Sequence, residues 1–162
     1  MNLVAGAPPW LAALLMVMLL IAAVEDAWRL RISNLVSAGV VVAAFVAVAL
    51  AGPIIGLWQN LLLFVAMLAI GTMLFARGVM GGGDIKLLAA CALWFDLGSG
   101  WKMLVAVAIA GGIEAILVTC LRLIPWPDAA RDRVAILRRK TEIPYGIAIA
   151  GGMAMITWWL RS

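Results

Sequence analysis

Two aspartates with unusual neighbours are the residues of this sequence best suited to chemistry. Asp84 follows three glycines in residues 80–86 (Met-Gly-Gly-Gly-Asp-Ile-Lys), and Asp26 ends the first apolar stretch. A carboxylate in or beside a bilayer is costly and is usually kept there for function. Two carboxyl groups within hydrogen-bond distance share one proton, so one can take a proton from water while the other donates to a carbonyl oxygen. Such a pair could hydrolyse a peptide bond without a metal or a covalent intermediate.

The residues that the sequence lacks narrow this chemistry further. It contains no histidine, which excludes Ser-His-Asp hydrolases, Cys-His proteases and His-ligated zinc proteases. Its two cysteines, Cys91 and Cys120, lie in apolar runs without a Cys-x-x-Cys motif, as small buried hydrophobic residues do. Hydrolysis would therefore depend on carboxylates or lysine, and we expect neither a metal nor an organic cofactor.

The composition predicts the elements that must position the two acids. Of the 162 residues, 67% are hydrophobic and only 12% are charged, whereas soluble domains carry about 25% charged residues. We therefore predict an all-α, polytopic membrane protein with a single domain over residues 1–162. Since about 20 apolar residues cross a bilayer, and glycine and proline break the apolar runs, we expect six transmembrane helices. They lie near 8–25, 34–51, 55–76, 85–95, 102–123 and 143–160, and the fourth is short for a span.

The basic residues predict which side of the membrane the acids face. With six spans, ten Lys and Arg residues fall on one side and two, Lys102 and Arg161, on the other. Positively charged loops face the cytoplasm, which places both aspartates at the cytoplasmic interface. The ten are Arg29, Arg31, Arg77, Lys86, Arg122, Arg131, Arg133, Arg138, Arg139 and Lys140. The last five fall in residues 129–140, where we expect an interfacial helix on anionic membrane lipids or a segment that gates substrate entry.

Each of these residues also has a simpler interpretation. The three glycines could form only a turn, with Asp84 capping the next helix, and Asp26 could pair with Arg29 or Arg31. In the catalytic interpretation, Gly81 and Gly83 allow the substrate backbone to approach. Lys86 either tunes the acid pair or binds lipid phosphate.

Glu114 is a third acid, near the middle of the span at 102–123, where a charge is expensive. Two adjacent glycines, Gly111 and Gly112, would let a neighbouring helix approach it closely. The sequence leaves two roles open for Glu114: a protonated or hydrogen-bonded structural group, or a group that binds substrate.

Three motifs resemble those of one known family. Gly81-x-Gly83-Asp84 matches the G-x-G-D signature of intramembrane aspartyl proteases, and its extension resembles the type IV prepilin peptidases. The segment from Asp26 to Asn34 resembles that family's first motif, with Ser33 where proline is usual. Pro144-Tyr-Gly146 resembles a third element, before the last helix. The resemblance implies that Asp26 and Asp84 are the catalytic pair and that Gly81, Gly83, Lys86, Pro144 and Gly146 lie beside the substrate.

Within this family the chain is similar to the short TadV/CpaA-like branch, which serves Flp-type pili. Longer relatives carry an insert with paired Cys-x-x-Cys motifs and also methylate the new terminus. This sequence has no such insert between its first two spans. The resemblance therefore implies peptidase activity without evident methyltransferase activity.

The sequence as a whole favours an inner-membrane aspartyl endopeptidase that removes the leader of prepilin-like substrates at the cytoplasmic face. The expected partners are that protein substrate and membrane lipids but no nucleic acid, and the oligomeric state is not assigned. The alternatives are a small proton-coupled transporter or channel subunit, which would use membrane-embedded acids as a relay, and a non-catalytic pilus assembly factor.

Overall fold

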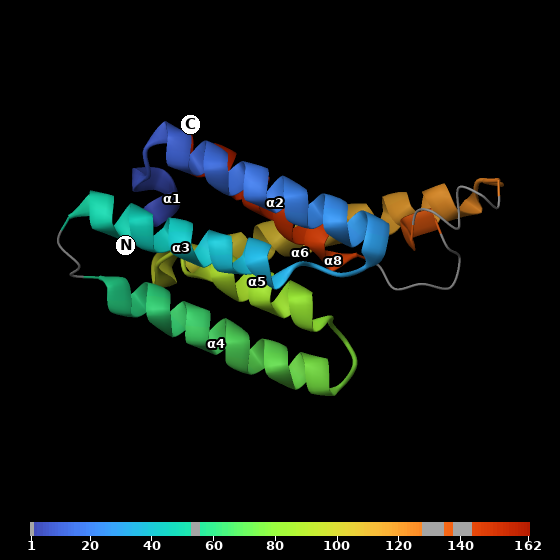
Figure 1. The fold of residues 1–162 in the computed structure, drawn as a ribbon, viewed down its shortest axis with the longest axis horizontal. Helices are drawn as coiled ribbons and strands as arrows, with labels where there is room; N and C mark the ends of the chain where they lie inside the picture. The colour runs from blue at the N-terminus through green and yellow to red at the C-terminus, as the bar shows by residue number, and fades with distance from the viewer. Residues whose placement is uncertain (1, 53–55, 128–134, 138–143) are drawn as a thin grey trace.

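The protein is a bundle of helices (Figure 1). The computed structural model describes residues 2–52, 56–127, 135–137 and 144–162, and none of these residues forms a strand. The predicted all-α class is confirmed. In chain order, the elements are α1 (Leu3–Gly6), α2 (Pro9–Arg29), α3 (Asn34–Ala51), α4 (Leu57–Ala76), α5 (Gly82–Ala92), α6 (Leu97–Leu123), the short 3₁₀ helix η1 (Ala135–Leu137) and α8 (Tyr145–Arg161).

Each of the six predicted spans corresponds to one helix, although their ends differ. Four helices, α2, α3, α4 and α6, are long and apolar enough to cross a membrane, while α5 and α8 are shorter. The predicted start of α6 at residue 102 is wrong: the helix begins at Leu97, because the Asp96 side chain caps it by accepting from the Ser99 N–H at 2.8 Å. Together with the many large apolar side chains on the surface, these spans describe a polytopic membrane protein.

Successive helices run in alternating directions, so chain segments far apart in the sequence meet at each end of the bundle (Figure 1). The last turns of α2, α4 and α6 lie at one end, with the first turns of α3, α5 and α8. We call this the aspartate end, because it holds Asp26 and Asp84. Lys102 and Arg161 belong to the opposite end, and the described basic residues Arg29, Arg31, Arg77, Lys86 and Arg122 belong to the aspartate end. The other five basic residues and the expected interfacial helix lie outside the described residues, apart from η1.

The short helix α5 lies in the protein core. It packs against α3, α4 and α8, and its last turn together with the residues that follow it, from Ala89 to Phe95, is at most 2% exposed. Two side chains fix the turn that follows it: Asn60 donates to the Leu93 carbonyl at 2.9 Å, and Trp94 donates to the Val40 carbonyl at 3.2 Å. Because protein surrounds α5 on several sides, it need not be as long as a helix that faces lipid.

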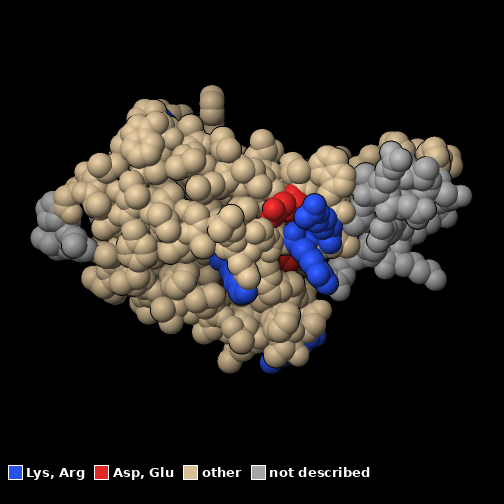
Figure 2. All heavy atoms as spheres, viewed as in Figure 1, with Lys and Arg blue, Asp and Glu red and all other residues tan. Residues whose placement is uncertain are grey.

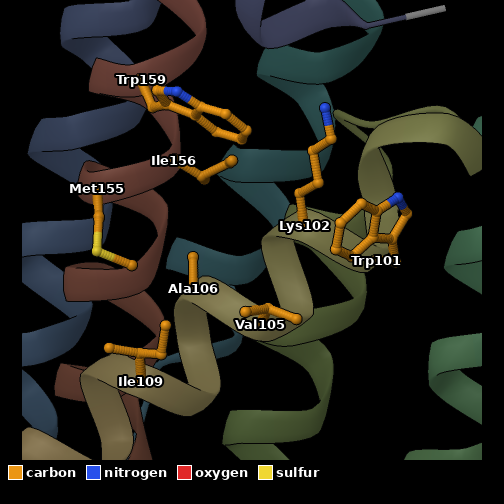
Figure 3. A pocket seen from close by; sticks show the side chains of 8 residues that line it. All are labelled: Trp101, Lys102, Val105, Ala106, Ile109, Met155, Ile156 and Trp159. Carbon is orange, nitrogen blue, oxygen red and sulfur yellow. The ribbon is translucent and has the colours of Figure 1, made fainter.

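The end of the bundle opposite the aspartates is closed by α1 and rich in tryptophan. The Leu3 N–H donates to the Trp94 carbonyl at 2.9 Å. A cavity of about 360 Å³ opens here between α6 and α8. Lys102 lies beside it, 4.9 Å from the Trp159 ring and 5.9 Å from the Trp101 ring (Figure 3). The residues lining this cavity include no acid, so it does not match the chemistry that the sequence predicts.

Helices α6 and α8 touch along a line of small residues, and this contact sets the position of the first turn of α8. A Cβ atom added to Gly152 would lie 2.5 Å from the Cα of Val107 and 2.6 Å from its backbone nitrogen. A Cβ on Gly111 would meet the Ala148 methyl group at 3.4 Å. Such close approach is typical of helix pairs in membranes, which associate through packing.

We predict that Gly152→Ala destabilises the protein by about 1–3 kcal/mol, because the new methyl group must push the α6 backbone away. The measurement is the thermal unfolding midpoint in detergent. Gly112→Ala is the matched control, since a Cβ there would meet nothing within 4 Å, and its midpoint should not fall. Equal midpoints for Gly152→Ala and the unaltered protein would show that the α6–α8 contact is looser than described.

Candidate active site

Asp26 lies in the last turn of α2, where its carboxylate accepts a hydrogen bond from another helix. The side chain is 3% exposed, and its Oδ2 accepts from the Gly146 backbone N–H at 2.7 Å. Gly146 belongs to the first turn of α8, whose N–H groups have no partner within their own helix and carry partial positive charge. The α8 N-terminus therefore holds and stabilises the Asp26 carboxylate.

Gly146 must be a glycine for this contact to form. A Cβ atom there would lie 2.9 Å from Asp26 Cβ, Asp26 Oδ2 and Ile32 Cδ1. Pro144, the N-cap residue directly before α8, is also buried. We expected both residues to lie beside the substrate. The structure shows that Gly146 contacts the candidate catalytic acid, and a contact with substrate stays a prediction for both.

Asp84 projects from the first turn of α5, where the glycines also have a packing role. Helix α5 begins at Gly82 with Gly81 as its N-cap, so the expected glycine loop is partly helical. Gly81 occupies the N-cap position of this helix, and Asp84 lies in its first turn. A Cβ on Gly81 would lie 2.7 Å from Asp84 Oδ2. The Asp84 side chain is 9% exposed, so both acids are shielded.

Ile32 connects the two halves of the site, a role that the sequence did not reveal. A Cβ on Gly83 would meet Ile32 Cβ, N and O at 3.3 Å, and the same Ile32 reaches Gly146 with its Cδ1. The order of contacts is therefore Asp26, Gly146, Ile32, Gly83 and the adjoining Asp84. Ile32 belongs to the first family-like motif, but an apolar residue there gave no signal beyond the motif itself.

The loop that carries Ile32 is held by local hydrogen bonds. Leu30 ends α2 in the left-handed conformation with φ 51°. The Ser33 N–H donates to Glu25 Oε2 at 2.9 Å, and the Ser33 hydroxyl caps α3 by accepting from the Leu35 N–H at 3.2 Å. Serine thus provides an α3 cap at the position where the resemblance expects proline.

Lys86 is exposed, and its amino group donates to Asn34 Oδ1 at 2.9 Å, which joins α5 to the start of α3. Asn34 is the last residue of the first family-like motif. The contact makes Lys86 a link between two motifs, while binding of substrate by Lys86 stays a prediction.

A small cavity of about 200 Å³ lies over Asp84. Its walls are the loop residues Leu30, Arg31 and Ile32 on one side and Gly81, Gly82 and Gly83 on the other. The glycine wall has no side chains, so an extended peptide could approach Asp84 closely. Figure 2 shows acidic and basic side chains together at this end of the bundle, while most of the rest of this face carries neither.

Glu114 lies closer to the aspartates than its place in the sequence indicated. It is 6% exposed, and it interacts electrostatically with both Asp26 and Asp84. The Ala148 backbone N–H of α8 is nearby but not in hydrogen-bond geometry, and neither Glu114 oxygen has a hydrogen-bond partner among the described residues. Among the residues that the structure describes, no three acidic or cysteine side chains lie close enough together to bind a metal ion.

A sequence model of the type IV leader peptidase family matches residues 13–121, about two thirds of the chain. The chain belongs to this family. The match includes both aspartates and the glycine segment, and it ends before α8. Neither a curated protein nor a solved structure gave a match. This leader peptidase is thus a membrane protein of the protease class, which agrees with the resemblance seen in its motifs.

We predict that Gly146→Ala lowers cleavage at least tenfold, because the methyl group would displace the Asp26 carboxylate from the α8 N-terminus. Initial rates on a leader-bearing substrate give the measurement, with Gly112→Ala as the control glycine. The unfolding midpoint of each variant separates a misplaced acid from an unfolded protein. A rate for Gly146→Ala equal to that of the control would mean that this contact does not position Asp26.

Proposed function

We propose that this leader peptidase is an aspartyl endopeptidase in which Asp26 and Asp84 form the catalytic pair. One observation carries the proposal: two buried acids, distant in the chain, are held at the same end of the bundle by glycines that contact one isoleucine. The sequence also contains no histidine. Paired carboxylates are therefore the best candidates for acid-base catalysis in this chain.

The pair would cleave a peptide bond by activating water. The ionised carboxylate takes a proton from water as the oxygen attacks the scissile carbonyl carbon, and the protonated carboxyl donates to the carbonyl oxygen. The tetrahedral diol then collapses: the nitrogen gains a proton, the C–N bond breaks, and a carboxylic acid and an amine leave. The pair titrates as a unit, so the proton belongs to the dyad rather than to either residue.

The distribution of charge supports a cytoplasmic active site in the inner membrane. Five of the seven described basic residues lie at the aspartate end, and positively charged loops face the cytoplasm. A prepilin-like substrate suits this placement, since its basic leader would lie at the surface while its apolar helix stays in the bilayer. Only residues 30–33 separate α2 from α3, which leaves no room there for a Cys-x-x-Cys insert and agrees with the TadV/CpaA-like branch.

The arrangement of the acids argues against a proton relay. A transporter would distribute acids through the depth of the membrane. Here Asp26 and Asp84 both lie at the aspartate end, in the last turn of α2 and the first turn of α5, while Glu114 lies deeper, within α6.

We predict that Asp26→Asn and Asp84→Asn each abolish cleavage, because an amide can neither take a proton from water nor supply an acidic proton. The measurement is the leader-sized mobility shift of a co-expressed Flp-type prepilin. Asp96→Asn, at the opposite end, is the control that removes a carboxylate without affecting processing. Normal processing by either of the first two variants, at equal protein levels, would contradict the proposed pair.

A further inference from the structure

A second cavity near the acids has apolar walls and one acid. It measures about 430 Å³ and lies between α4, α5, α6 and α8. Glu114 is the one acid among its lining residues, and most of its walls are apolar. Leu104 and Tyr145, which line it, are 36% and 39% exposed, so the cavity is open to the surface of the bundle. Its apolar walls are Leu74, Met80, Leu88, Leu104, Val107 and Ile149.

The burial of the Glu114 carboxyl group costs free energy. A buried carboxyl without a hydrogen bond loses the solvation that water gave it, and the loss is greater when the group is charged. Neither of its oxygens has a hydrogen-bond partner among the described residues. A buried polar group left unsatisfied beside a cavity is suited to a ligand that supplies the missing donor.

The chemistry of the proposed substrate supplies such donors. The first four N–H groups of any helix have no partner within that helix and carry partial positive charge. In a protein with an extended leader followed by an apolar helix, these free N–H groups come directly after the scissile bond. In a bilayer no water is present to satisfy them, and a side-chain oxygen, including that of a carboxylate, can cap them.

We propose that Glu114 caps the N-terminus of the substrate's apolar helix, which lies in the cavity between α4, α5, α6 and α8. This inference rests on the proposed function and adds a substrate-positioning residue to it. The cavity that Glu114 lines is also lined by Tyr145, which adjoins the Asp26 partner Gly146, and by Leu88, one turn after Asp84. A helix capped there therefore begins close to the catalytic pair. The cap selects substrates that become helical immediately after the cut and leaves the preceding peptide bond extended for attack.

The test measures binding in the Asp84→Asn protein, which is not expected to cleave. The probe is a synthetic peptide with a lysine-rich leader and an apolar helix of about 20 residues, titrated into the protein in lipid nanodiscs. A second peptide is N-methylated at the first three amides after the cleavage position, which removes free N–H groups but no hydrogen bond within the helix. A third is N-methylated only in the leader.

With Glu114 present, we expect methylation after the cleavage position to weaken binding about tenfold, which is near the upper end of the loss for one ordinary hydrogen bond. With Glu114→Leu added, the first and second peptides should bind equally. Glu114→Gln, whose amide oxygen still accepts, should show an intermediate loss of binding on methylation. This variant replaces Glu114→Leu in the test if the leucine variant does not fold.

Asp96→Asn is the matched control, and it should keep the full penalty. The leader-methylated peptide should bind every variant as the first peptide does. An equal penalty with and without Glu114, or no penalty in either protein, would overturn the capping role. Binding and processing are separate measurements, so failure of the capping role and failure of the catalytic pair give different results: the first abolishes the difference between peptides, and the second leaves cleavage in Asp26→Asn or Asp84→Asn.

Discussion

The site depends on a hydrogen bond between residues 120 positions apart, in which the Gly146 N–H donates to Asp26 Oδ2 at 2.7 Å. Burial of a carboxylate costs less when a donor is aimed at it, and the free N–H groups at the start of α8 provide that donor for Asp26. The bond forms only if α8 begins beside the last turn of α2. That condition constrains the packing of α8 and the identity of residue 146.

The tight contact of α6 with α8 serves the same requirement. Gly152 lies against the Val107 backbone so closely that a Cβ would come within 2.5 Å of it. This contact fixes the position of the first turn of α8 in the bundle. The same approach brings Ala148 near Glu114, so one pair of helices positions a donor for Asp26 and a neighbour for the third acid.

The burial of α5 solves a different problem. Asp84 has to lie near Asp26 although it is carried by a helix too short to be an ordinary span. The core position of α5, fixed at its far end by Asn60 and Trp94, anchors its first turn without a long lipid-facing surface. Ile32 then fills the space between Gly83 and Gly146, and the site becomes a continuous set of contacts.

The sequence by itself determined the class of fold and the approximate place of each helix, and it singled out the candidate acids. Apolar length, charge bias and the spacing of Asp26 and Gly81–Asp84 are local properties of the chain, and the alternation of spans places both acids at one end. The tertiary structure decided the rest. Packing between distant helices brings Gly146 to Asp26, lets Ile32 connect two motifs and places Glu114 on the side of α6 that faces α8. No local pattern encodes those contacts, because hydrophobic periodicity specifies which segments are buried and not which atoms meet.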